Sequence, residues 1–231
     1  MAEPDNWQPL ESNPEIMNSY CKKLGFETND LIFQDVFSTD DWALDMVGDN
    51  CMGVLLVFPI TENYKKDSFP DPVSPEQLPP SMFYMYQTSK NACGTVGVYH
   101  IIGNLPEDLK QAALKENSVF SNFFENAKGK SYEEKADDFN NDQELKSKHC
   151  EAVEKGKTEI PDSVSNHFVA FVMKDGGLYE LDGRKKGPIY YRPTSQESFL
   201  KDACAVIKTE YIEKDSENPN FAIIALAGLP T

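Results

Sequence analysis

Two apolar segments joined by a two-residue turn constrain the fold more than any other feature of the sequence. They are Phe168–Met173 and Leu178–Leu181, with Asp175 and Gly176 at the centre of the link between them. An Asp-Gly pair in this place favours a type I′ turn, whose twist matches that of two antiparallel strands. We therefore expect a β-hairpin with a fixed register.

The register brings two polar residues together at the open end of the hairpin. It sets Asp182 opposite Val169, and His167, two residues before Val169, then lies on the same face as Asp182 and diagonally across from it. The imidazole and the carboxylate are neighbours in this arrangement. A three-residue turn would instead put the two side chains on opposite faces.

Helix and strand patterns are interleaved along the rest of the chain. Asn13 and Pro14 predict the N-cap and first residue of a helix that Gly25 ends. Residues 107–148 are polar and helix-prone, whereas 62–80 and 149–166 have the composition of loops. The other expected elements are strands at Leu31–Phe37, Gly53–Phe58, Phe83–Gln87 and Phe221–Ala227, and helices at Asp40–Val47 after a Thr39 cap, at Cys93–Ile102 and after a capping box from Thr194 to Glu197.

These patterns lack a regular strand–helix–strand rhythm, which a parallel sheet would need. They predict an α/β (α+β) fold with a central mixed or antiparallel sheet flanked by helices. The length of 231 residues suits one well-buried domain, which we expect over residues 1–231.

The charge of the chain limits its partners. A net charge of −16 disfavours nucleic acid, because that binding relies on Lys and Arg to neutralise phosphates. A basic protein partner is compatible with the charge, although solubility alone explains an acidic surface. No apolar run approaches the roughly 20 residues of a membrane helix, and the first residues lack a signal-peptide pattern. We expect no membrane association, and a cytosolic protein that can also enter the nucleus.

The cysteines indicate a free thiol rather than a metal site or a disulfide framework. They stand at positions 21, 51, 93, 150 and 204, an odd number without a Cys-x-x-Cys pair. Three scattered histidines add no metal-ligand spacing. We therefore expect no metal and no cofactor.

Cys93 has the setting of a reactive thiol. It lies where a turn enters a helix, between the small residues Ala92 and Gly94. Free N–H groups at a helix start stabilise a thiolate, and small neighbours leave room for a substrate carbonyl. Gln87 can bring its amide near the sulfur and form an oxyanion hole with the Cys93 backbone N–H. A buried cysteine without a chemical role is the alternative, and the commoner fate of a free cysteine.

The hairpin supplies the partners that such a thiol needs. An aspartate beside an imidazole orients the ring and stabilises its cation, while the second ring nitrogen faces the thiol. Cys93, His167 and Asp182 are therefore candidates for a catalytic triad; a surface histidine and a turn aspartate are the alternatives. His100 and His149 lack such a setting, so we expect a helix residue and a solvated loop residue.

Four motifs of the sequence resemble those of the ubiquitin carboxyl-terminal hydrolases. Their order and spacing match the small branch of that family, which is almost wholly catalytic domain, from about residue 7 to 228. The motifs are Trp7-x-Pro-Leu10-Glu11-Ser-Asn13-Pro14-Glu15, Gln87-x3-Asn91-Ala-Cys93-Gly94-Thr95, His167-Phe168 and Leu178-Tyr179-Glu180-Leu181-Asp182-Gly183-Arg184.

The resemblance implies a papain-like fold with a knotted backbone. It implies that Gln87 serves the oxyanion hole, that Cys93 is the nucleophile, that His167 is the general base and acid, and that Asp182 orients His167. It also implies a crossover loop, at about 149–166, that passes over the active site and admits only narrow leaving groups.

The family's acidic groove holds the arginine-containing tail of ubiquitin. By the resemblance this groove maps to Glu11, Glu15 and Asp35, with Leu10 beside it.

The expected function is that of a monomeric thiol hydrolase, which releases small adducts and short peptides from the C-terminal glycine of ubiquitin. The related modifier NEDD8 has a similar tail, and the sequence does not rank the two substrates. A ubiquitin-binding protein with little turnover is an alternative, against which the complete triad and Gln87 speak. A generic papain-like protease is another, which the crossover loop and the acidic groove disfavour.

Overall fold

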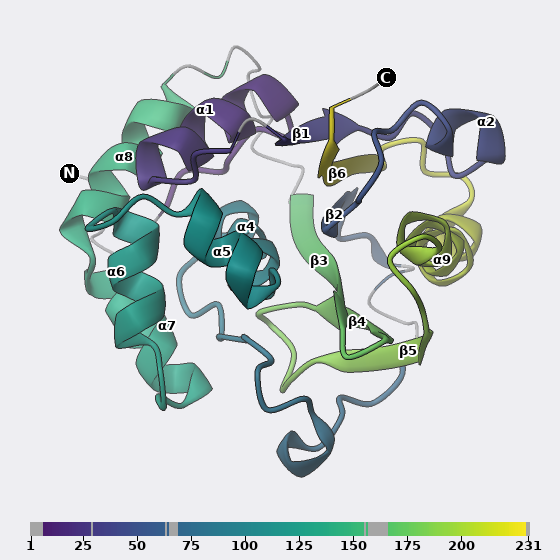
Figure 1. Cartoon of the computed structure of the whole chain (residues 1–231). Helices are drawn as coiled ribbons and strands as arrows, with labels where there is room; N and C mark the ends of the chain where they lie inside the picture. The colour runs from purple at the N-terminus through teal and green to yellow at the C-terminus, as the bar shows by residue number, and fades with distance from the viewer. Residues whose placement is uncertain are drawn as a thin grey trace.

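A six-stranded sheet lies at the centre of the protein (Figure 1). The computed structural model describes residues 7–28, 30–62, 64, 69–154, 156 and 166–229. In this part of the chain the strand order is β1-β6-β2-β3-β4-β5, and each neighbouring pair is antiparallel. The strands are β1 (Leu31–Asp35), β2 (Gly53–Pro59), β3 (Asn166–Lys174), β4 (Gly177–Leu181), β5 (Ile189–Pro193) and β6 (Ala222–Gly228). The expected α/β fold is confirmed, with antiparallel rather than mixed pairing.

Helices cover both faces of the sheet (Figure 1). One side carries α1 (Pro14–Leu24), α4 (Cys93–Gly103), α5 (Glu107–Ala113), α6 (Val119–Asn126), α7 (Tyr132–Asn141) and α8 (Gln143–Val153). The other side carries α2 (Asp41–Leu44) and α9 (Phe199–Ile207), which continues into the π-helical turn η2 (Lys208–Ile212) and the 3-10 turn η3 (Glu213–Asp215). A further 3-10 turn, η1, covers Pro75–Gln77.

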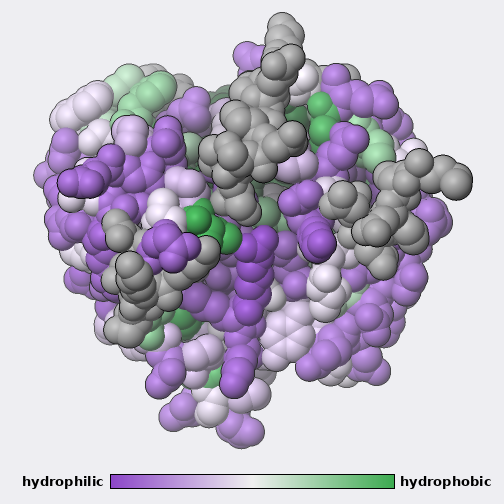
Figure 2. Space-filling model, turned by 180° about the vertical axis from the view of Figure 1, so that it is seen from behind, coloured by the Kyte–Doolittle hydropathy of each residue, from purple (hydrophilic) through white to green (hydrophobic). Residues whose placement is uncertain are grey.

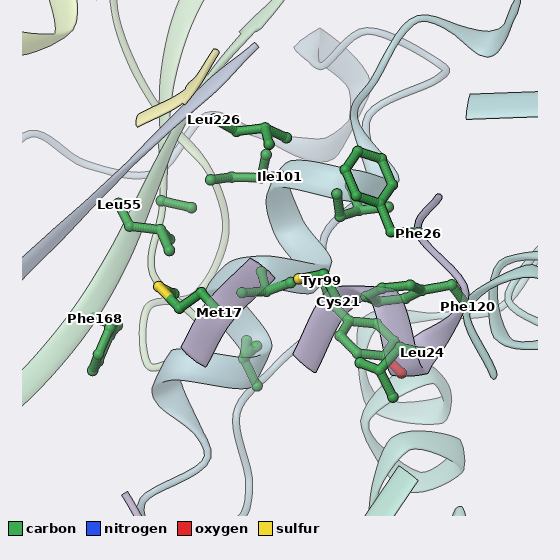
Figure 3. Close-up of a cluster of buried hydrophobic side chains, with 14 of the residues drawn as sticks. Met17, Cys21, Leu24, Phe26, Leu55, Tyr99, Ile101, Phe120, Phe168 and Leu226 are labelled. Atoms are coloured by element: carbon green, nitrogen blue, oxygen red, sulfur yellow. The ribbon is translucent and has the colours of Figure 1, made fainter. Parts of the chain in front are cut away.

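Helix α1 begins and ends as its sequence predicts. The Asn13 side chain accepts hydrogen bonds from the backbone N–H groups of Glu15 and Ile16, and Gly25 ends the helix with a φ of 100°. Its buried residues face α4 and the sheet, where Met17 and Cys21 lie near Tyr99 and Leu55 (Figure 3). Burial of each large apolar side chain contributes roughly 1.5–3 kcal/mol. This packing fixes the groove-lining end of α1 against the helix that carries Cys93.

The predicted hairpin register is confirmed. Lys174 pairs with Gly177 and Ala170 pairs with Leu181. Asp175 and Gly176 have φ values of 47° and 73°, the left-handed values that a type I′ turn requires. The next residue after the strand is Asp182, so the hairpin delivers it to the end of the sheet where His167 lies.

Two helix starts differ from the prediction. Helix α2 begins after Asp40 rather than Thr39, and no side chain caps it. Helix α9 begins after Ser198 rather than in a capping box at Thr194, because the Thr194 hydroxyl bonds the carboxylate of Asp202 instead. Both segments are short polar runs in which several residues can serve as a cap.

The predicted strand at Phe83–Gln87 is absent. The segment runs between α4 and the turn after β4, where side chains and single carbonyls satisfy its backbone. The N–H of Phe83 donates to the side chain of Asn104, that of Met85 to the imidazole of His100, and that of Gln87 to the carbonyl of Gly183. Strand β5 was not predicted, because its five residues form a short run that ends in Arg192 and Pro193 and shows no clear alternation.

The surface is predominantly hydrophilic on the face shown in Figure 2, as the net charge of −16 leads one to expect. Within the described ranges, no helix combines the length and apolar character that crossing a membrane requires. Over the same residues, no three His, Cys, Asp or Glu side chains gather as metal ligands would.

Candidate active site

Three elements bring Cys93, His167 and Asp182 together. Cys93 is the first residue of α4, His167 is the second residue of β3, and Asp182 follows β4 directly. The Nε2 of His167 lies 2.8 Å from the Oδ1 of Asp182. All three side chains are buried, with His167 1 % and Asp182 2 % exposed. The thiol of Cys93 also lies 3.9 Å from the carbonyl oxygen of Asn166, the residue before His167.

The electrostatics of this cluster favour an ion pair between the thiol and the imidazole. Burial alone would raise the pKa of Cys93, but its interaction with the His167 imidazole and the charge of that ring outweigh burial and lower the pKa. Burial would lower the pKa of His167, yet the charge and hydrogen bond of Asp182, with a smaller effect of Cys93, raise it to about 9. The imidazolium in turn outweighs burial and lowers the pKa of Asp182. The arrangement thus stabilises the charged form of each group: the thiolate of Cys93, the imidazolium of His167 and the carboxylate of Asp182.

The other buried cysteines have the opposite character. Burial raises the pKa of the thiols of Cys21, Cys51 and Cys204. A neutral buried thiol is a poor nucleophile. Among these cysteines the environment of Cys93 alone combines burial with a lowered pKa, which is the signature of a reactive thiol.

Gln87 lies on the segment that leads into helix α4. Its backbone N–H donates to the carbonyl of Gly183, and its side-chain amide donates to the carbonyl of Ser89 at 3.0 Å. The side chain therefore spans the turn that leads into Cys93. The amide nitrogen carries a second hydrogen, which can serve as a donor to a substrate.

The residues predicted to bind substrate line one groove that reaches the thiol. This groove has a volume of about 620 Å³ and also contains Asn91 and Asn166. The predicted residues in its wall are Leu10, Glu11, Glu15 and Asp35, beside Cys93. Burial raises the pKa of Asp35. The structure thus places an acidic channel next to a reactive sulfur.

A second groove, of about 720 Å³, lies between α2 and the start of α9. Its wall contains none of the predicted site residues. It therefore contributes nothing to the chemistry at Cys93.

His149 is not the solvated loop residue that the sequence suggested. Helix α8 continues to Val153, and His149 is 2 % exposed. One ring nitrogen lies 2.7 Å from the carbonyl oxygen of Gln8, and the other lies 3.1 Å from the hydroxyl of Thr95. His149 therefore ties the N-terminal wall of the groove to α4. The repeat of Leu145, His149 and Ala152 on one helix face is the signal that could have revealed it.

The predicted crossover loop at 149–166 is partly helix, because residues 149–153 belong to α8. Residues 155 and 157–165 lie outside the described part of the chain. The described ends of this interval both reach the groove. A Cβ placed on Gly156 would lie 2.8 Å from the Oε2 of Glu11, and Asn166 lines the groove beside Cys93.

Comparisons with a family model and with known proteins point to the same family. The family model described as ubiquitin carboxyl-terminal hydrolase, family 1, matches residues 7–213. Ubiquitin carboxyl-terminal hydrolase 3 of Arabidopsis thaliana is 36 % identical over 223 residues, which cover 96 % of this chain and 94 % of that protein. The human isozyme L1 is 31 % identical over 222 residues, which cover 95 % and 97 %.

A solved structure shares the fold. The catalytic domain of Trichinella spiralis UCH37, bound to ubiquitin vinyl methyl ester, superposes with a TM-score of 0.75 at 17 % identity. The match covers 97 % of this chain and 96 % of that one.

Proposed function

The chain belongs to family 1 of the ubiquitin carboxyl-terminal hydrolases, and we propose that it works through an acyl-enzyme on Cys93. It is a cysteine-type ubiquitin C-terminal hydrolase. One observation carries the mechanism: the thiol with a lowered pKa meets the imidazole that bonds Asp182, at the end of an acidic groove.

The reaction proceeds in two steps. The thiolate of Cys93 attacks the carbonyl carbon of the terminal glycine, an S–C bond forms, and the carbonyl electrons move to oxygen. The bond to the leaving amine then breaks as His167 donates a proton to that nitrogen. A water molecule attacks the thioester, His167 takes a proton from it, and the sulfur leaves as a thiolate. Asp182 keeps the ring oriented and stabilises its cation throughout.

Gln87 and the backbone N–H of Cys93 are the donors to the oxyanion in this proposal. Both belong to the turn and helix start that carry the sulfur. Such donors act most strongly where charge develops in the transition state.

Ubiquitin is the partner that the groove suits. The carboxylates of Glu11, Glu15 and Asp35 offer a basic, extended tail a channel toward Cys93, with Leu10 in the same wall. The matched structure from Trichinella spiralis holds a ubiquitin ester. NEDD8 is a second modifier to compare, because its tail is similar.

The leaving groups proposed for this enzyme are small adducts and short peptides. Gly156 contacts the groove wall at Glu11, and Asn166 lies beside the thiol, so the chain between them starts and ends at the groove. A segment that crosses a cleft as a closed loop would pass an extended peptide and exclude a folded protein.

A ubiquitin with an electrophilic C-terminus tests this function. We expect it to modify Cys93, identified by mass spectrometry, and Cys93→Ser to abolish both labelling and hydrolysis of a ubiquitin C-terminal amide while still binding ubiquitin. A NEDD8 probe, run alongside, ranks the two modifiers. Labelling of the exposed Cys150 instead, or turnover by Cys93→Ser, would contradict the mechanism.

The alternative of a binding protein with little turnover makes a different prediction. It requires wild-type protein to bind ubiquitin without hydrolysing its C-terminal amide. The lowered pKa of Cys93 and the hydrogen bond between His167 and Asp182 favour turnover.

A further inference from the structure

Tyr84 is a buried tyrosine that the mechanism above does not use. It lies in the segment before α4 and is 0 % exposed. Its hydroxyl lies 2.6 Å from the carbonyl oxygen of Asp182 and 2.7 Å from that of Lys185. The phenol therefore contacts both ends of the turn that follows β4.

The orientation of the Asp182 carboxylate depends on this turn. The backbone N–H of Lys185 donates to the Asp182 carbonyl at 2.9 Å, which closes the turn. Inside it, the N–H of Arg184 donates to the Oδ1 of Asp182 at 3.0 Å. The same oxygen accepts the hydrogen bond from His167. A shift of the turn would therefore move the oxygen that orients the imidazole.

The ring of Tyr84 is itself held in place by the nucleophile helix. It stacks on the imidazole of His100 with centroids 5.0 Å apart and planes 10° apart. Tyr132 packs edge-on against it at 4.9 Å. His100 is a buried residue of α4, the helix that begins at Cys93. Tyr84 thus joins the element that carries the thiol to the turn that carries the carboxylate.

We propose that Tyr84 is a positioning residue, whose hydroxyl holds the Asp182 turn against α4 and so keeps the triad assembled without substrate. The inference rests on the roles proposed for Cys93, His167 and Asp182. Tyr84 touches none of the reacting atoms and acts through Asp182.

Other charged and titratable groups surround the Asp182–His167 pair. Lys185 is engaged by the buried carboxylate of Glu180 at 2.7 Å, which also accepts the hydroxyl of Tyr191 at 2.7 Å. The Lys185 side chain is therefore bound by Glu180. The carbonyl of Asp182 accepts hydrogen bonds from the Tyr84 hydroxyl and from the backbone N–H of Lys185. Several groups act electrostatically on the pair or lie beside it. They are Cys93 and His100 from α4, Tyr84 from the preceding segment, Tyr64 from the loop after β2, Tyr211 from η2, Glu180 from β4, and Arg184 and Lys185 from the turn.

The test removes one oxygen atom. Tyr84→Phe keeps the ring contacts with His100 and Tyr132 and loses the bonds to the turn. We expect kcat to fall about 5- to 30-fold, the rate equivalent of one hydrogen bond. KM should stay unchanged, because the substrate groove is built from other residues.

The pH dependence gives the readout that a merely structural role would not move. A displaced Asp182 lets the pKa of His167 fall from about 9 and the pKa of Cys93 rise. The bell-shaped pH profile of kcat/KM should therefore become narrower. Its acid limb should move up and its alkaline limb down, each by roughly half a pH unit. The alkylation rate of Cys93 by iodoacetamide, resolved from Cys150 by mass spectrometry, should show the same shift of its acid limb to higher pH. This rate needs no ubiquitin, so it remains informative if the proposed function fails.

Tyr86→Phe is the matched control. Its hydroxyl donates to the carbonyl of Lys186 at 3.1 Å, outside the turn, so both pH limbs should stay in place. If Tyr84→Phe unfolds in the absence of substrate, a saturating ubiquitin substrate stabilises its folded state. The acid and alkaline limbs are then measured in the pH profile of kcat. Unmoved limbs in Tyr84→Phe, or a raised KM at unchanged kcat, would overturn the proposal.

Discussion

His167 takes its chemistry from neighbours on two sides. The negative charges of Asp182 on one side and of the Cys93 thiolate on the other stabilise the protonated ring, so it keeps a proton that its burial would otherwise expel. The same burial acts against charge at every group of the triad, and their mutual contacts are the main effects that reverse it, with smaller help from Arg184 and Lys185. Loss of any one partner should therefore expose the remaining two to an uncompensated desolvation penalty.

The first prediction concerns Asp182→Asn and the free energy of unfolding. The folded-state pKa of His167 is raised from 6.5 to about 9, so its contribution to stability is full below pH 6.5 and is lost as the pH rises through about 9. The lowered pKa of Asp182 contributes above its ordinary value of 3.8 and is lost as the pH falls through its lower, folded-state value. Breaking a buried pair costs about 3–5 kcal/mol. Urea denaturation should therefore show the largest loss near pH 6 and a smaller one above pH 9; a loss independent of pH would contradict the pairing.

The second prediction concerns Gln87→Ala. Removal of one oxyanion donor should lower kcat on the order of 10²–10³-fold, with little change in the affinity for ubiquitin. Stopped-flow measurement of acyl-enzyme formation separates this effect from binding. The Gln87 side chain also bonds the Ser89 carbonyl, so Gln87→Glu, which loses the amide donor but keeps the side-chain length, serves as a second variant. A rise in KM at constant kcat would identify Gln87 as a docking residue instead.

Helix α1 is the element that connects local sequence to the proposed substrate groove. Its N-cap is set by Asn13, and the cap fixes the first turn, where Glu15 enters the wall of the groove. Asn13 also lies 3.5 Å from the Oε1 of Glu11 through its amide nitrogen. One side chain therefore organises two of the three groove carboxylates.

The third prediction follows from this cap. Asn13→Ala should cost about 1 kcal/mol of stability and should raise KM for ubiquitin more than it lowers kcat. Thr39→Ala is the control, since no side chain caps α2 and the same loss of a polar side chain should be nearly neutral. Thermal unfolding and steady-state kinetics on the two variants check both statements. Equal effects at the two positions would show that capping is not the cause.

Elements whose bounds are set by turn or capping residues could be predicted from the sequence. The Asp-Gly turn set the hairpin register, and Asn13, Pro14 and Gly25 set the bounds of α1, because each acts on its own backbone within a few residues. Strand β5 and the roles of Tyr84 and His149 depend on contacts with distant segments. His149 meets Gln8, far away in the chain, and no local pattern records such a partner.

At the scale of the whole molecule, the proposed preference for small leaving groups depends on the chain around the groove. Both described ends of the interval from 156 to 166 lie at the groove, one against Glu11 and the other beside Cys93. The proposed gate would therefore depend on chain connectivity as well as on the residues around the sulfur.

The fourth prediction concerns the size of the leaving group. The wild-type protein should release small adducts and unstructured extensions from ubiquitin much faster than it cuts folded ubiquitin dimers. A flexible Gly/Ser insertion between positions 160 and 161 should enable dimer cleavage, because each doubling of loop length costs only about 0.6 kcal/mol of closure entropy. The insertion avoids Gly156, where it would disturb Glu11. Activity on the small adduct is the control; equal wild-type rates on both substrates would contradict the gate.

The place of β6 between β1 and β2 sets an order of events during synthesis on the ribosome. Among the described strands, β1 pairs with β6 alone, yet Leu31 leaves the ribosome almost two hundred residues before its partner Gly228. A nascent chain therefore carries Cys93, His167 and Asp182 well before Asp35 at the end of β1 can take its place in the groove wall. During that interval the edge of β1 is open to chaperones and to aggregation, and this wall of the groove cannot be completed until β6 has been synthesised.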